Sequence, residues 1–235
     1  MASLDVESLF TNVPVEETIK IILKNVYENS NIPSPKINRE VLRKLLLICT
    51  TECPFKTPTG EMFKQIDGVS MGSCLGPTFA NFYMCNLENK VISALLKKPN
   101  IYARYVDNIF IEVENEDQLR ILKDVMEQNS ILKFTYELNI NNKLPFLDII
   151  IDNDSTTYTT SVYRKTTNSG ACMNGSGDTT DKYKKSVIGS YVRRALKTCS
   201  TWNLVHEEIN KVKQMLINNN YTNFLVDNEV NRIVT

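Results

Sequence analysis

Residues 101–113 read IYARYVDNIFIEV, and this stretch decides the fold that the sequence predicts. Apolar and aromatic residues stand on both sides of Asp107 and Asn108, which is typical of two strands joined by a short turn. Aspartate and asparagine both tolerate left-handed backbone conformations, so we expect the turn at Asp107-Asn108. Taken alone, Asp107 is more simply explained as a turn former than as a functional acid.

A second aspartate, Asp5, stands in a similar setting near the start of the chain. Residues 3–8 alternate apolar with small or polar residues and then meet Leu9-Phe10, which suits a short strand and its exit. Carboxylates from two different strands can hold a pair of divalent ions about 4 Å apart, as phosphoryl transfer requires. Mg²⁺ prefers such oxygen ligands. Asp5 and Asp107 are therefore the candidate metal ligands.

The rest of the chain predicts helices and short strands. Helix starts are indicated at Pro14, Asn38 and Pro77, because proline and asparagine suit the first turn of a helix. We also expect a hairpin over residues 54–63, a glycine-bearing loop over 68–77, helices over 116–129, 183–199 and 203–218, and strands over 132–138, 144–151 and 157–163. This order predicts an α+β fold, in which an antiparallel sheet is backed by helices and followed by a helical region.

The overall charge gives no general sign of a nucleic-acid-binding protein. The 235 residues contain 27 Lys and Arg and 27 Asp and Glu, so the net charge is zero, whereas phosphate contacts usually require a basic excess. One segment departs from this neutrality, with Lys182, Lys184, Lys185, Arg193, Arg194 and Lys197. Such a run is often a solvated helix face, and the alternative is a surface that follows a nucleic-acid backbone.

The cysteines and the apolar runs argue against other classes of protein. The six cysteines form no CxxC pair and His206 is the one histidine, so a structural zinc site is not expected. The N-terminus lacks the basic and apolar regions of a signal peptide, and the longest apolar run is too short for a membrane span. We expect an intracellular protein, nuclear or cytoplasmic and not secreted, with reduced thiols.

Five segments follow one another along the chain as LDVESLFTNVP (4–14), QIDGVSMGSCLGPTFAN (65–81), YVDNIF (105–110), LPFLD (144–148) and VYRKT (162–166). Together they resemble motifs of the reverse transcriptases of Penelope-like retroelements, and a weaker similarity continues over 185–200. The resemblance implies a reverse-transcriptase palm over residues 1–165 and a thumb-like helical region over residues 166–235. It also implies RNA-directed DNA polymerase activity with Mg²⁺ or Mn²⁺, on an RNA template, a DNA primer and a dNTP.

The resemblance assigns roles around the two aspartates. Asp5 and Asp107 would ligate the metal ions, and the Val6 carbonyl and Asn108 would each add an oxygen. Phe10 would be the steric gate that leaves no room for a ribose 2′-hydroxyl. Without the resemblance, Phe10 is equally well explained as a core aromatic residue.

Other residues receive roles in binding the nucleotide and the nucleic acid. The lining of the templating base pair would be formed by Gly68, Met71 and Gly72, because glycine allows a close approach of the backbone. Leu147 would contact the primer, and Lys143 or Lys133 would protonate pyrophosphate, although both also fit solvated surface lysines. The nucleic-acid backbone would be bound by Lys182, Lys185, Arg193 and Arg194.

The sequence departs from the family pattern in three places. Asn108 stands where the family has a second aspartate, so metal affinity should be lower by the loss of a full charge. We expect a fragment, because finger motifs before Asp5 and a GIY-YIG nuclease are missing from the sequence. The alternative function is therefore a catalytically inactive retroelement remnant that only binds nucleic acid or a partner. A nuclease that uses the same two aspartates is a third hypothesis.

Overall fold

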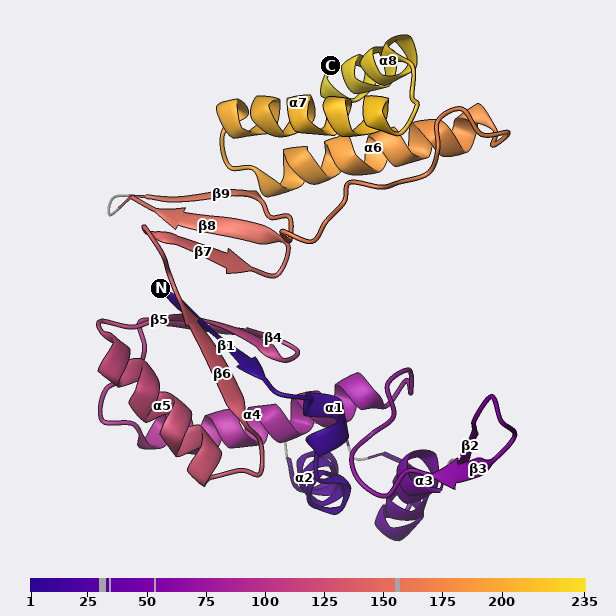
Figure 1. Cartoon of the computed structure of the whole chain (residues 1–235). Helices are drawn as coiled ribbons and strands as arrows, with labels where there is room; N and C mark the ends of the chain where they lie inside the picture. Colours follow the sequence, from indigo (N-terminus) through magenta and orange to yellow (C-terminus); the bar gives the residue numbers. More distant parts are fainter. Residues whose placement is uncertain (30–32, 34, 53, 155–156) are drawn as a thin grey trace. The chain divides into compact units, whose positions relative to one another are not determined.

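The chain forms two compact units, Met1–Glu137 and Leu138–Thr235 (Figure 1). The structure is a computed structural model and describes residues 1–29, 33, 35–52, 54–154 and 157–235. The units have opposite net charge: residues 1–137 contain 15 Lys and Arg and 18 Asp and Glu, and residues 138–235 contain 12 and 9. The division after residue 165, which was expected from the sequence, stays a proposal.

A four-stranded sheet in the order β4-β5-β1-β6 forms the centre of the first unit. Its strands are β1 (Ala2–Val6), β4 (Ile101–Tyr105), β5 (Asn108–Glu112) and β6 (Phe134–Leu138). Strand β5 pairs antiparallel with both β4 and β1. The segments that contain Asp5 and Asp107 are therefore neighbours in one sheet.

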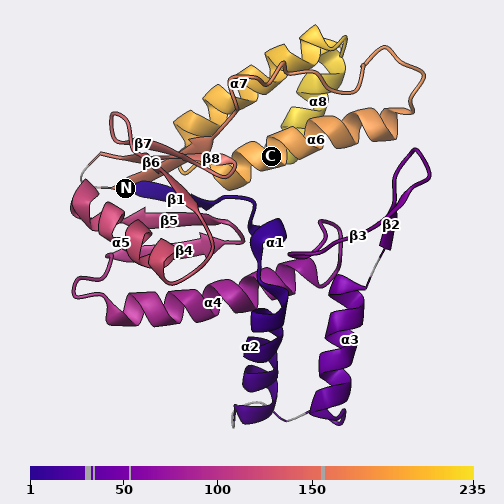
Figure 2. The ribbon, with the colours of Figure 1, turned by 60° about the horizontal axis from the view of Figure 1, so that its bottom comes forward.

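Helices α4 (Gly76–Ala94) and α5 (Glu116–Gln128) cover one face of this sheet (Figures 1 and 2). Leu4 of β1 and Ile109 of β5 are buried in the same core as Phe79 of α4. Side chains alternate between the two faces of a strand. Burial of Leu4 on the helix-covered face therefore turns its neighbour Asp5 to the other face, where it is exposed.

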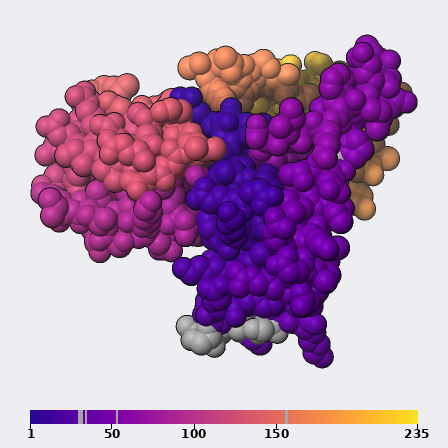
Figure 3. Space-filling model, turned by 90° about the horizontal axis from the view of Figure 1, so that it is seen from below, coloured from indigo at the N-terminus to yellow at the C-terminus, as the bar shows by residue number. Residues whose placement is uncertain are grey.

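The first unit also contains α1 (Leu9–Asn12), α2 (Val15–Glu28), α3 (Arg39–Thr51) and the hairpin β2 (Pro54–Lys56) and β3 (Met62–Lys64). The Asn38 side chain caps α3 by accepting a hydrogen bond from the Glu40 amide at 2.8 Å, as the sequence predicts. Helices α2 and α3 lie side by side and project from the sheet layer (Figures 2 and 3). The large apolar side chains of Val41, Leu45 and Ile48 on α3 remain about half exposed.

The second unit places three helices beside a three-stranded sheet. The strands β7 (Lys143–Phe146), β8 (Ile149–Asn153) and β9 (Tyr158–Val162) pair antiparallel in chain order. The helices are α6 (Asp181–Thr198), α7 (Trp202–Asn218) and α8 (Asn223–Val234). A separate core of Ile188, Val192 and Val212 with their neighbours holds this unit together.

The α+β class is confirmed, two local predictions are wrong, and two helices were not predicted. The turn between β4 and β5 lies at Val106-Asp107 and not at Asp107-Asn108, because Tyr105 pairs with Asn108. The strand predicted over residues 144–151 is two strands, since Phe146 pairs with Ile149 and the chain reverses between them. Two helices were not predicted: α1, which has only four residues, and α8.

Two negative findings concern only the part of the chain that the structure describes. No helix there has the length and apolar character needed to cross a bilayer. The described cysteines, at positions 49, 74, 85, 172 and 199, are free thiols, and Cys53 lies outside the described residues.

Candidate functional site

The sheet brings Asp5 and Asp107 together. Asp5 is directly opposite Asn108 in the β1–β5 register. The amide of Val6 donates a hydrogen bond to the carbonyl oxygen of Asp107 at 3.1 Å. Asp5 on β1 and Asp107 in the turn before β5 therefore occupy adjacent backbone positions, and the Val6 carbonyl lies on the same short stretch of β1.

The loop that holds Asp107 has an unfavourable backbone conformation. Val106 has a φ of 57°, in the left-handed region where a β-branched residue is a rare outlier. Conformations of this kind persist only where the surroundings impose them, and they concentrate at functional sites. Asp107 is thus presented by a loop that the rest of the unit must hold in place.

Negative charge accumulates around Asp5. The pKa of Asp5 is raised above its ordinary value, first by partial burial and then by the charges of Asp107, Glu137 and Glu7, while a hydrogen bond from the Val6 amide opposes the shift. Glu137 on β6 and Glu7 were not expected to take part. The one sequence signal that could have revealed Glu137 is its place in a strand that joins the same sheet.

The donor set around these aspartates suits a hard divalent cation, which would relieve the mutual repulsion that raises the Asp5 pKa. No group of three or more His, Cys, Asp or Glu residues forms a ready-made metal cluster within the described ranges. The Asn108 side chain donates a hydrogen bond through Nδ2 to Oδ1 of Asp107 at 3.0 Å. A cation would therefore depend on Asp5, Asp107 and backbone oxygen.

Phe10 and the glycine loop pack against each other beside this site. The Val69 amide donates to the Phe10 carbonyl oxygen at 2.7 Å. A Cβ atom on Gly68 would lie 2.4 Å from the carbonyl oxygen of Thr11, and one on Gly76 would lie 3.4 Å from the Phe10 ring. Only glycine at position 68 allows the loop to approach α1 so closely.

Two candidate residues of the glycine loop, Met71 and Gly72, are open to solvent. The Met71 side chain is 74% exposed. Gly72 has a φ of 100° and no atom within 4 Å of the place where a Cβ would stand. The structure therefore groups Phe10 with Gly68 and leaves Met71 and Gly72 on an exposed bend.

The candidate lysines Lys133 and Lys143 form local ion pairs. Lys133 pairs with Glu127 at 3.7 Å, and Lys143 pairs with Asp152 at 3.3 Å. Leu147 lies in the loop between β7 and β8, with a φ of 54°. The ion pairs of Lys133 and Lys143 do not indicate a specific chemical role for either lysine.

The basic residues of α6 differ from one another in their surroundings. Arg194 pairs with Asp148 at 3.3 Å and donates to the Tyr163 carbonyl at 3.2 Å, so it fixes the loop that contains Leu147. Lys182, Lys185 and Arg193 are exposed. Because they are exposed, these three side chains could contact the phosphate backbone of a nucleic acid.

Comparison with known proteins assigns the first unit. Residues 1–143 match the family model described as reverse transcriptase (RNA-dependent DNA polymerase), which is more than half of the chain. The chain belongs to the reverse transcriptase family. Residues 178–231 of this reverse transcriptase chain also match the animal helix-turn-helix domain model, over the segment that contains α6, α7 and most of α8. No curated protein matches the sequence.

Solved structures share the fold of this reverse transcriptase chain. Telomerase from Candida albicans, in complex with a TWJ fragment of telomeric RNA, aligns with a TM-score of 0.63 and 12% identity over 99% of the chain and 40% of the telomerase. The Sicinivirus 3Dpol RNA-dependent RNA polymerase aligns with a TM-score of 0.57 and 14% identity over 99% of the chain and 51% of the polymerase. Apo telomerase from Candida tropicalis, truncated from its C-terminal domain, aligns with a TM-score of 0.51 and 16% identity over 67% of the chain and 34% of that protein. The chain therefore spans about a third to a half of the length of these structures.

Proposed function

We propose that this chain supplies the palm of an RNA-directed DNA polymerase from a Penelope-like retroelement. The observation that carries the proposal is the adjacency of Asp5, on β1, and Asp107, in the turn that leads into the paired strand β5. The family match supports the polymerase class. The motif resemblance of residues 144–166 supports the Penelope-like subtype.

In this proposal Asp5 and Asp107 hold Mg²⁺ or Mn²⁺, with oxygen from the Val6 carbonyl. The bound ions would stabilise negative charge on the phosphate of a dNTP that is attacked by a primer 3′-hydroxyl. The residues of the chain bind and orient the reactants. Asp5 must be ionised to bind the cation, and its raised pKa means that a proton competes with the cation for this carboxylate as the pH falls.

Phe10, Gly68, Met71 and Gly72 would form the nucleotide pocket. Gly68 fixes the glycine loop on α1, next to the Phe10 backbone. The Phe10 ring would then lie under the sugar and reject a 2′-hydroxyl by contact. In the second unit, Leu147 and the exposed Lys182, Lys185 and Arg193 would bind the primer and the RNA template, and Lys143 would serve as the general acid. The reaction would take place inside the cell, in the nucleus or the cytoplasm.

A second candidate function is that of an inactive remnant that binds nucleic acid without extending it. Asn108 favours this reading, because its amide occupies Asp107 in place of a second ionised ligand. The substitution Asn108→Asp would add a carboxylate at the same point. The effect of this change on activity therefore separates a weakened polymerase from a remnant.

The test is primer extension on an RNA template with Mg²⁺ or Mn²⁺ and labelled primer. The proposal expects extension that Asp107→Ala abolishes and Asn108→Asp increases. Absence of extension from both the unchanged chain and the Asn108→Asp variant, with intact binding of the template–primer, would establish the remnant. Shortening of the primer without added dNTPs would instead identify a nuclease.

A further inference from the structure

Arg104 connects the strained loop at Val106 to helix α4. Its side chain is only 9% exposed, although it carries a full charge. The Nε and Nη2 atoms donate to the two carboxylate oxygens of Glu88, at 2.5 and 3.3 Å. The Nη1 atom donates to the carbonyl oxygen of Val106 at 3.0 Å. One planar guanidinium thus joins the helix and the loop.

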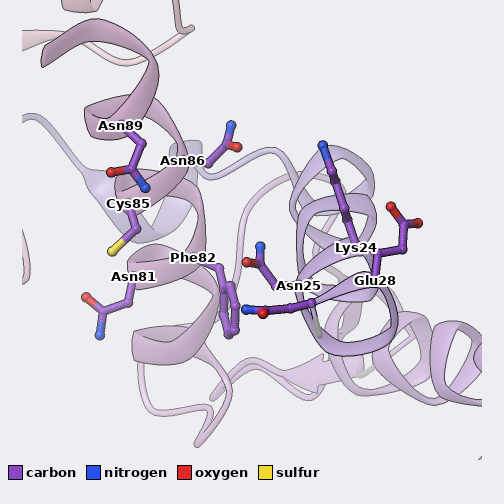
Figure 4. A pocket seen from close by; sticks show the side chains of 9 residues that line it. Lys24, Asn25, Glu28, Asn81, Phe82, Cys85, Asn86 and Asn89 are labelled. Carbon is purple, nitrogen blue, oxygen red and sulfur yellow. The ribbon is translucent and has the colours of Figure 1, made fainter. Parts of the chain in front are cut away.

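Two more side chains of α4, Asn81 and Cys85, contact the Arg104 guanidinium. Nη1 also donates to Oδ1 of Asn81 at 3.0 Å, and Nη2 lies 3.4 Å from Sγ of Cys85. Asn81 and Cys85 lie on one side of α4, and Phe82 lies on the side that faces α2 (Figure 4). The guanidinium therefore has a fixed position on α4, and the carbonyl of Val106 is held relative to that helix.

The contact with Val106 is the one that bears on the candidate site. Val106 adopts a φ of 57°, a conformation that the isolated sequence would avoid. The next residue is Asp107, whose carbonyl accepts the hydrogen bond from Val6 in β1. Hydrogen bonds to the carbonyls on either side of the Asp107 Cα thus hold the backbone that presents the Asp107 carboxylate.

We propose that Arg104 is a positioning residue, which holds the Val106 carbonyl on α4 and thereby aims the Asp107 carboxylate at the cation shared with Asp5. This role rests on one part of the proposed function, namely that Asp5 and Asp107 bind a divalent cation. A purely structural ion pair between β4 and α4 would need Glu88 but not Val106. The proposal therefore predicts that loss of the Arg104–Val106 contact weakens cation binding even where the fold is retained.

The main variant replaces both members of the buried pair, Arg104→Leu with Glu88→Leu. An apolar pair leaves no unpaired buried charge, so we expect the fold to be retained, but nothing then holds the Val106 carbonyl. Arg104→Lys is the second variant, because a single ammonium cannot reach both Glu88 and Val106 as the guanidinium fork does. The matched control is Tyr102→Phe, which removes a 2.9 Å hydrogen bond to Glu88 and leaves every Arg104 contact.

The measurement is calorimetric titration of the full chain with Mn²⁺, beside thermal unfolding and primer extension. We expect an unfolding midpoint close to that of the unchanged chain for the double variant, and at least a tenfold weaker Mn²⁺ affinity for both Arg104 variants. Tyr102→Phe should bind Mn²⁺ as the unchanged chain does. Addition of Val106→Gly to Arg104→Lys should recover part of the affinity, since glycine adopts a positive φ without strain.

Unchanged Mn²⁺ affinity in a folded Arg104→Lys chain would overturn the proposal. So would Mn²⁺ binding that Asp5→Asn does not weaken, because the cation would then lie elsewhere. If the unchanged chain binds Mn²⁺ through Asp5 but neither it nor the Asn108→Asp variant extends a primer, the polymerase proposal fails. The titration then still decides the role of Arg104.

Discussion

Alanine at position 68 should destabilise the Met1–Glu137 unit much more than alanine at position 72. Both glycines have positive φ angles, 67° and 100°. They differ in their surroundings: a Cβ on Gly68 would lie 2.4 Å from the Thr11 carbonyl oxygen, whereas a Cβ on Gly72 would meet no atom within 4 Å. The pair therefore separates the conformational cost from the steric cost.

The magnitudes follow from these two terms. A non-glycine residue in the left-handed region costs about 1–2 kcal/mol, and this term applies to both variants. Overpacking against the backbone of α1 adds about 1–3 kcal/mol for Gly68→Ala alone. With a urea dependence of about 2 kcal/mol per M, the unfolding midpoint should fall by roughly 1–2.5 M for Gly68→Ala and by roughly 0.5–1 M for Gly72→Ala.

Urea unfolding monitored by circular dichroism and by tryptophan fluorescence provides the measurement. Trp202 is the one tryptophan and lies in the Leu138–Thr235 unit. Its fluorescence transition should stay in place for both variants, while the transition of the first unit moves. Equal midpoint shifts for Gly68→Ala and Gly72→Ala would refute the close approach of the glycine loop to α1.

Two further predictions concern charged groups. Because the pKa of Asp5 is raised, the folded chain keeps the Asp5 proton at pH values where the unfolded chain has lost it, and the stability from this group falls as the pH rises between the two pKa values. Asp5→Asn should therefore raise the urea midpoint more at neutral pH than near pH ~4, the ordinary range of an Asp carboxyl. Equal effects at both pH values would contradict the shift. In the second unit, Glu208 is 7% exposed and pairs with Arg164, so Arg164→Met should cost about 3–5 kcal/mol by leaving a buried carboxylate unpaired. Addition of Glu208→Leu should recover most of that loss in Trp202 fluorescence unfolding, and a single variant as stable as the unchanged chain would show that the pair contributes nothing.

The elements that the sequence predicts well are those with a strong local pattern. The Asn38 cap, the hairpin around residues 54–63 and the α4 start at Pro77 depend on side chains that act within one turn. The boundary between β7 and β8 does not. Residues 144–151 are continuously apolar apart from Pro145 and Asp148, and only the pairing of Phe146 with Ile149 reveals a reversal there.

The proposed ligands of the candidate site can be picked out from the sequence, but the residues around them that hold them in place cannot. Asp5 and Asp107 stand out because each is an acid set into an apolar strand or its end. Nothing local indicates that Glu137 raises the Asp5 pKa, because that depends on β6 joining the sheet beside β1. Arg104 is equally hidden, since its partners Glu88 and Asn81 come from a helix that precedes it in the chain.

The opposite net charges of the two units bear on how a nucleic acid would find this chain. The net charge of the whole chain is zero, so no net attraction by overall charge steers a polyanion toward it at long range. Screening limits attraction by the basic unit to roughly 8 Å at physiological ionic strength. The association rate constant should therefore respond little to added salt, while the dissociation rate constant should rise with it, because the phosphate contacts made after encounter are the salt-sensitive ones.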